Sequence, residues 1–208
     1  MSENKPSEVA SNPGLWTPAN IVTTARVVLV PFWLLVAEML CPDGLAGSSA
    51  DTGMLAVFAF YVILSLTDKL DGYLARSRGE VTTFGKFLDP IADKLVVIVS
   101  LCFLLEHGLT TSWVLLVIVA REFLVSGLRM VVASKGVVVA ASNLGKWKTA
   151  TTMVSISGLL LCMALPQGSL FTWLVIISQL MLLIAVVLTA WSGIDYFMKS
   201  WKYLAEDC

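Results

Sequence analysis

The sequence predicts an all-α membrane protein: a bundle of six transmembrane helices with both termini in the cytoplasm. Hydrophobic residues make up 57% of the 208 residues and charged residues only 14%, whereas a soluble domain carries about 25% charged residues. The apolar residues gather into long runs, and all 14 Lys and Arg fall on one side of the topology that these runs define. This composition excludes an ordinary soluble globular protein, a disordered chain and a nucleic-acid-binding protein with a basic surface.

Each expected span is an apolar run of the roughly 20 residues that a helix needs to cross the hydrocarbon core. The runs do not alternate as barrel strands would, and lipid accepts only helices or closed barrels because backbone polar groups must be satisfied there. Turn-rich segments separate several of the runs, at 41–49, 106–108 and 166–169. The six spans are expected at about 20–40, 53–75, 87–105, 112–133, 147–165 and 170–196.

The Lys and Arg residues set the orientation of these spans. They lie around the start of the first span, between the second and third, on the second half of the fourth and the following connection, and after the sixth. The other three connections contain none. The positive-inside rule therefore places both termini in the cytoplasm. We expect a flexible polar tail at 1–16, a transmembrane domain at 17–198 and a short cytoplasmic tail at 199–208.

Two pairs of aspartates lie where the second span ends and the third begins. Asp68 and Asp71 are three residues apart and Asp89 and Asp93 four apart, so each pair shares one helix face. A short polar connection makes the two helices antiparallel neighbours, and the four carboxylates can converge near the cytoplasmic surface. Such a cluster is unfavourable by itself, but Mg²⁺ or Mn²⁺ prefers carboxylate oxygens. We expect two such divalent ions, arranged for in-line displacement at phosphorus.

Small residues accompany these aspartates. Gly72, Ala75 and Gly85 either leave a notch beside the metals or serve helix packing, where small residues are common in membranes. With the aspartates and Arg76 they complete the pattern D-x₂-D-G-x₂-A-R-x₈-G-x₃-D-x₃-D. This pattern resembles the signature of the CDP-alcohol phosphatidyltransferases, and the likeness covers nearly the whole chain beyond the N-terminal tail. Segments 20–31, 120–129 and 144–149 are most similar to the bacterial members that form phosphatidylglycerophosphate.

The resemblance implies an activity and a location. The phosphatidyl group of CDP-diacylglycerol would pass to glycerol 3-phosphate with release of CMP, at the cytoplasmic face of a bacterial inner membrane. The family likeness also implies a homodimer among membrane lipids. It assigns the metals to Asp68, Asp71, Asp89 and Asp93, makes Asp93 the general base as well, and assigns the CDP moiety to Gly72, Ala75, Arg76 and Gly85.

Three polar residues repeat at the start of the first span. Asn20, Thr23 and Arg26 are each three residues apart, and the family likeness favours a face directed at the nucleotide. The alternative is helix capping together with an arginine that extends to the membrane surface.

Basic residues in the second half of the chain predict a site for the phosphate of the acceptor. Arg121 and Arg129 lie near one helical face, and Glu122 can pair with one of them. Arg offers a bidentate contact to phosphate and Lys a point charge. The alternative is that these cations anchor the protein at the membrane surface. The expected acceptor site comprises Arg121, Arg129, Lys135, Lys146 and Lys148.

Two other functions stay open at this point. One is the same chemistry with another acceptor, such as inositol phosphate or serine, since the shared signature does not select the acceptor. The other is a divalent-cation transporter, in which acidic residues bind the permeating ion. A transporter holds such charges near the bilayer midplane, often in related halves. The aspartates here lie toward one face, which favours the enzyme.

Overall fold

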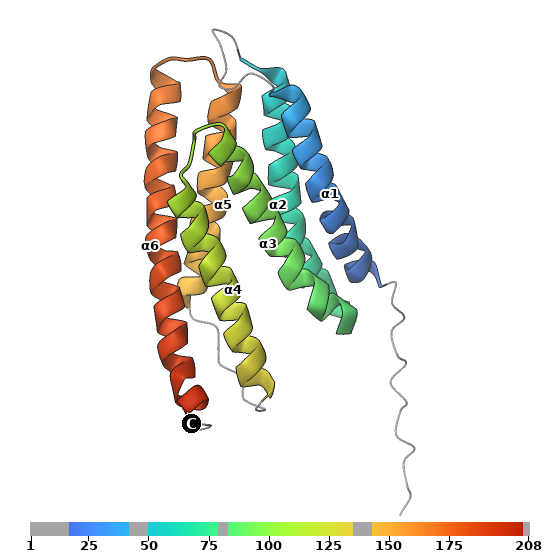
Figure 1. Cartoon of the computed structure of the whole chain (residues 1–208). Coiled ribbons are helices and arrows are strands. Elements are labelled where there is room, and N and C mark those ends of the chain that lie inside the picture. Colours follow the sequence, from blue (N-terminus) through green and yellow to red (C-terminus); the bar gives the residue numbers. More distant parts are fainter. Residues whose placement is uncertain (1–16, 42–49, 79–82, 135–142, 206–208) are drawn as a thin grey trace, which may run out of the picture.

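Six α-helices form the part of the chain that the structure, a computed structural model, describes (Figure 1). It describes the backbone of residues 17–41, 50–78, 83–134 and 143–205, and their side chains apart from those of 18–19, 68–78, 83–87, 89, 143 and 202–205. Because no strand occurs in these segments, the all-α class is confirmed. The helices are α1 (Pro18–Leu40), α2 (Thr52–Arg78), α3 (Thr83–Glu106), α4 (Ser112–Ser134), α5 (Asn143–Ala164) and α6 (Ser169–Ala205).

The helices match the predicted spans but are longer at one end of the bundle. α2 continues to Arg78, α5 begins at Asn143, and α6 runs to Ala205, into the segment expected as a tail. Hydropathy marks only the part of a helix that lipid surrounds. Polar residues such as Lys and Arg are good helix formers, and they extend the helices beyond that part.

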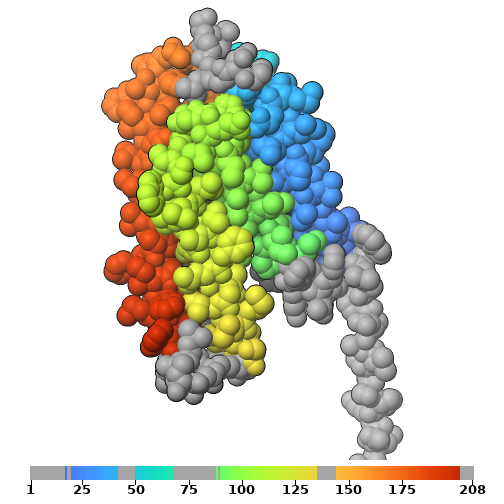
Figure 2. All heavy atoms as spheres, viewed as in Figure 1, coloured from blue at the N-terminus to red at the C-terminus, as the bar shows by residue number. Residues whose placement is uncertain are grey.

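Successive helices run antiparallel, so the start of α1 and the end of α6 lie at the same end of the bundle (Figure 1). We call this the basal end. α1 packs against α2 and α3, α2 against α5, α5 against α6, α6 against α4, and α4 against α3, which closes a ring. Among the described residues, the backbones of α4 and α5 do not approach each other closely. α3 and α4 touch near their connection and separate toward the basal end (Figures 1 and 2).

An aromatic cluster joins α1, α2 and α3. The Trp33 ring lies 6.0 Å from that of Tyr61 and 5.7 Å from that of Phe103, between ring centroids. All three side chains are buried. The Trp33 Nε1–H donates to the Val57 carbonyl at 3.0 Å, so the indole hydrogen-bonding group is satisfied as buried aromatic residues require. This cluster holds α1, α2 and α3 together. The basal ends of α2 and α3 carry the signature aspartates, and the basal end of α1 carries Asn20, Thr23 and Arg26.

Two helices begin with side-chain caps. Thr17 Oγ1 accepts from the Asn20 N–H at 3.3 Å at the start of α1, and Pro18 follows at the first position, where proline is favoured. Asp51 Oδ1 accepts from the N–H groups of Gly53 and Met54 at 2.8 and 3.1 Å at the start of α2. These bonds satisfy donors that have no partner inside the helix.

Large apolar side chains cover the outside of the bundle, including Phe32, Met39, Trp113, Phe123 and Leu183, all of them exposed. Two of the described helices are long and apolar enough to cross a membrane, over Asn20–Leu40 and Ser169–Trp201. A soluble helix directs such side chains to the core and polar ones to water. The described surface therefore suits lipid.

Candidate active site

The signature residues lie on two helices that meet at the basal end. Five of them fall on the last turns of α2 and three on the first half of α3. The structure describes the backbone of all eight residues but only one of their side chains, that of Asp93. The assignments of the other seven remain predictions: Asp68, Asp71, Gly72, Ala75, Arg76, Gly85 and Asp89.

Asp93 forms an ion pair with α1. Its Oδ1 accepts from Arg26 Nη1 at 2.9 Å. The Arg26 side chain is only 2% exposed, whereas that of Asp93 is 45% exposed. A buried guanidinium thus holds an accessible carboxylate, which is the arrangement a group needs if it is to meet a substrate from a fixed position.

The first turns of α1 bury the other polar residues of the predicted nucleotide face. Asn20 and Thr23 are buried beside Arg26. The helix cap is Thr17, so capping does not account for Asn20 or Thr23. The burial of Arg26 likewise contradicts an arginine that extends to the membrane surface. Binding of the nucleotide by Asn20 and Thr23 remains a prediction.

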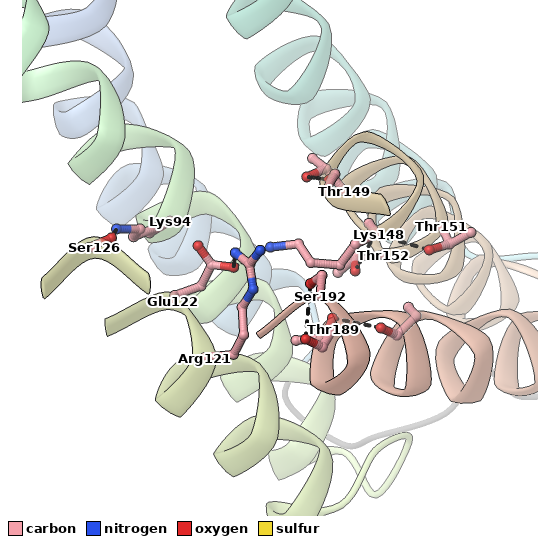
Figure 3. Close-up of polar contacts among 12 residues, drawn as sticks. Lys94, Arg121, Glu122, Ser126, Lys148, Thr149, Thr151, Thr152, Thr189 and Ser192 are labelled. Carbon is pink, nitrogen blue, oxygen red and sulfur yellow. Dashed lines mark hydrogen bonds and ion pairs between the residues drawn. The ribbon is translucent and has the colours of Figure 1, made fainter. Parts of the chain in front are cut away.

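A second polar cluster connects α4 with α5, two helices whose backbones stay apart (Figure 3). Glu122 Oε1 accepts from Arg121 Nη1 at 3.1 Å and also from Lys148 Nζ. The side chains of Arg121, Glu122 and Lys148 are 14, 16 and 10% exposed. In an apolar bundle, two cations on one carboxylate leave positive charge uncompensated, which favours binding of an anion.

Lys94 extends this cluster to α3. Its ammonium donates to Ser126 Oγ on α4, and it interacts electrostatically with both Glu122 and Lys148. Lys94 directly follows Asp93, and successive helix residues point about 100° apart. α3 therefore presents Asp93 to α1. It presents Lys94 to Ser126 of α4 (Figure 3).

Small and hydroxyl-bearing residues surround the cluster on the α5 and α6 side. The buried hydroxyls of Thr152 and Thr189 each donate to a carbonyl of their own helix, at 2.9 and 2.6 Å. A Cβ added to Gly193 would lie 3.1 Å from Arg121 Cγ. The Arg121 stem therefore crosses α6 where the absence of a side chain leaves room for it.

The other predicted acceptor residues have different surroundings. The Arg129 guanidinium stacks on the Tyr196 ring of α6, 5.6 Å from its centroid, a cation–π contact. Lys146 is exposed, and Lys135 lies outside the described residues. Of the five predicted residues, the structure thus brings Arg121 and Lys148 together. It adds Lys94 and Glu122, which were not among the predicted site residues.

The described residues contain no group of three or more His, Cys, Asp and Glu that could hold a metal ion. Three of the four aspartates predicted to bind metal have side chains outside that set. The donor chemistry nevertheless fits a hard divalent cation, because all four predicted ligands are carboxylates.

The sequence profile of the CDP-alcohol phosphatidyltransferases matches residues 16–191. The chain belongs to this family. The match includes all of the signature and the helices that carry Asp93, Lys94, Arg121 and Lys148. The family is embedded in membranes, which agrees with the apolar surface of the bundle.

Several members of the CDP-alcohol phosphatidyltransferase family are similar over most of their length. A Bacillus subtilis protein is 39% identical over 196 residues, 89% of this chain and 95% of the relative. A Pseudomonas fluorescens protein is 38% identical, covering 90% and 92%. A Haemophilus influenzae protein is 33% identical, covering 84% and 88%. Each is named CDP-diacylglycerol–glycerol-3-phosphate 3-phosphatidyltransferase.

Proposed function

We propose that this chain transfers the phosphatidyl group of CDP-diacylglycerol to glycerol 3-phosphate, giving phosphatidylglycerophosphate and CMP. The similar relatives carry the name of this activity. The structural observation that carries the proposal is the arrangement around α3. Asp93 faces α1 beside the predicted nucleotide residues, and Lys94 faces the cations of α4 and α5. α3 thus places the Asp93 carboxylate, for the acceptor hydroxyl, on one side. It places Lys94 and the cations of α4 and α5, for the acceptor phosphate, on another side.

Asp93 is the proposed general base. It takes the proton of the attacking hydroxyl of glycerol 3-phosphate, whose oxygen forms a bond to the phosphorus that bears the diacylglycerol. The bond from that phosphorus to CMP breaks, and CMP leaves with the electron pair. Arg26 fixes the direction of the carboxylate, so that proton transfer begins from one geometry.

Asp68, Asp71, Asp89 and Asp93 are proposed to hold two divalent ions, Mg²⁺ or Mn²⁺. The family is in general dependent on divalent metals, and the carboxylate donor set suits these ions. When bound, such ions stabilise negative charge on the pyrophosphate and on the departing CMP.

The acceptor phosphate is proposed to bind at Arg121 and Lys148. Their shared carboxylate neutralises only part of their charge, and guanidinium and ammonium groups bind phosphate by charge-assisted hydrogen bonds. Arg129, Lys135 and Lys146 would attract the acceptor to the same end of the bundle.

We further propose that all six helices cross a bacterial inner membrane, with the basal end and both termini in the cytoplasm. The described helices run antiparallel, with the start of α1 and the end of α6 at the basal end. The connections at the opposite end contain no Lys or Arg, as the positive-inside rule requires. The family resemblance also suggests a homodimer, which the mass of the detergent-solubilised protein tests.

An acceptor-competition assay tests the proposed reaction. Purified protein in detergent is mixed with CDP-diacylglycerol and either glycerol 3-phosphate, serine or inositol phosphate, and released CMP is measured. We expect release only with glycerol 3-phosphate, its loss on adding EDTA, and its return with excess Mg²⁺ or Mn²⁺. Release with serine or inositol phosphate alone would reject the assigned acceptor. Undiminished release in EDTA would reject the metal.

A further inference from the structure

The charge cluster around Glu122 has more positive than negative groups. Arg121 and Lys148 form ion pairs with the carboxylate of Glu122. Lys94, which donates to Ser126 one helical turn further along α4, interacts with that carboxylate electrostatically. With every group in its usual charge state, the cluster carries two net positive charges. Its members come from α3, α4 and α5. The side chain of Lys148 reaches from α5 to Glu122 on α4, although the backbones of these two helices are not in close contact.

Uncompensated charge of this size is costly inside a bundle with an apolar surface. The Arg121 Nε atom is also buried without a hydrogen-bond partner in the described structure, although buried donors are nearly always satisfied. Both observations indicate that the cluster is incomplete without an anion. A phosphate monoester carries about 1.5 to 2 negative charges near neutral pH and three acceptor oxygens.

We propose that Glu122 is the internal counter-charge of the acceptor pocket and that Lys94 is its third cation. Glu122 holds Arg121 and Lys148 in place while the pocket has no ligand. By neutralising one of three cations it sets the net charge at two, the value that suits a phosphate dianion and discriminates against a monoanion. This inference rests on the proposed function where it names glycerol 3-phosphate as the ligand. The preference for a dianion follows from the charges of the cluster and does not depend on that function.

The position of Lys94 makes this arrangement useful for the reaction. Lys94 is the residue after Asp93, and its ammonium is directed to Ser126 on α4, one helical turn after Glu122. A phosphate that Lys94 contacts is therefore held by the same helix turn that carries the proposed base. Glu122 is a positioning residue, because it acts on the ligand through Arg121 and Lys148. Lys94 is a binding residue, because its ammonium contacts the ligand.

Two probes of similar shape and different charge test the inference without turnover. Methyl phosphate is a dianion and methyl sulfate a monoanion at pH 8, and each is titrated calorimetrically into the purified protein. We expect the wild-type protein to bind methyl phosphate more tightly. Lys94→Met lowers the net charge to one, and we expect methyl phosphate affinity to fall about tenfold, with a smaller loss for methyl sulfate, since Coulomb energy scales with ligand charge.

Charge rescue separates this role from a purely structural one. Glu122→Gln raises the net charge to three and should tighten methyl phosphate binding, again by about tenfold. The double variant Lys94→Met with Glu122→Gln restores two net charges and should return to near wild-type affinity. If Glu122 were only a packing residue, Glu122→Gln would weaken binding and the double variant would be weaker still. That order of affinities would overturn the proposal.

Charge-conserving variants keep the test valid if Glu122→Gln does not fold. Lys94→Arg and Glu122→Asp should both retain the preference for methyl phosphate, and an affinity loss in Lys94→Arg equal to that in Lys94→Met contradicts the proposal. Asp195→Asn and Lys199→Met alter an exposed ion pair on α6 and serve as matched controls with unchanged binding. CMP release measured on the same preparations tests the proposed function separately, because the titrations do not depend on the reaction.

Discussion

The guanidinium of Arg26 on α1 contacts the carboxylate of Asp93 on α3 at 2.9 Å, across 67 residues of sequence. The arginine is almost wholly buried and the aspartate is half exposed. Arg26 is therefore held by the protein, and Asp93 is held by Arg26. The position of the proposed base thus depends on the packing of α1 against α3, which the Trp33 cluster secures further along both helices.

Substitution of Arg26 tests this dependence. We expect Arg26→Ala to lower kcat for CMP release about 100-fold, because small displacements of a catalytic group cost that much. Arg26→Lys keeps a cation but loses the planar guanidinium, and we expect an intermediate loss. Thermal unfolding in detergent is measured in parallel. A folded Arg26→Ala protein with wild-type kcat would show that Asp93 needs no such support.

Removal of the proposed base tests Asp93 directly. Asp93→Asn keeps the size of the side chain but cannot accept the proton, so we expect CMP release to fall by about 10²- to 10⁴-fold, the usual contribution of a general base. Much of the CDP-diacylglycerol binding should persist. Asp195→Asn, which changes a partly exposed carboxylate on α6, is the control with unchanged activity. Near-normal turnover in Asp93→Asn would remove Asp93 from this role.

The aliphatic part of the Arg121 side chain packs against Gly193 of α6, so we expect a methyl group added at Gly193 to affect the acceptor site. A Cβ at Gly193 would come within 3.1 Å of Arg121 Cγ, so Gly193→Ala should displace the guanidinium from Glu122. We expect the KM for glycerol 3-phosphate to rise about tenfold, equivalent to an overpacking cost of about 1.4 kcal/mol. The KM for CDP-diacylglycerol should change little. Gly127→Ala on α4 adds a methyl group where no atom lies within 4 Å and should leave both constants unchanged.

Hydropathy predicted the helices because a long apolar run in a membrane protein favours a helix, and this signal depends on local composition alone. It could not predict the ion pairs of the site. The paired residues of Arg26–Asp93 and Lys148–Glu122 are 67 and 26 positions apart in sequence, and these contacts depend on the order of helices around the ring. The signature includes Asp93 as a candidate site residue, whereas Lys94 enters the sequence prediction only among the charges that orient the chain. Helical geometry offered the missing signal, since a residue next to Asp93 must face a different neighbour of α3.

A close approach of α5 and α6 at Gly158 gives a prediction about stability. A Cβ built on Gly158 would lie 2.1 Å from Ser178 Oγ and 3.1 Å from Ser178 Cβ, so glycine permits these helices to approach as small residues do in membrane proteins. Since neither atom belongs to a long flexible side chain, the helices themselves must separate to admit a methyl group. We expect Gly158→Ala to lower the free energy of unfolding by about 1–3 kcal/mol.

A compensating substitution identifies this contact as the cause. Ser178→Gly removes both clashing atoms, so the double variant Gly158→Ala with Ser178→Gly should recover most of the lost stability, whereas Ser178→Ala retains the Cβ and should recover less. Thermal unfolding in a fixed detergent measures the series, with Gly127→Ala as the control for a glycine in open space. Equal unfolding temperatures for Gly158→Ala and the double variant would mean that the cost arises elsewhere in α5. Lys148 and Gly158 lie on the same helix, α5, and Lys148 pairs with Glu122 of α4. A displacement of α5 at Gly158 should therefore also move Lys148 and weaken methyl phosphate binding. The same double variant should restore that binding.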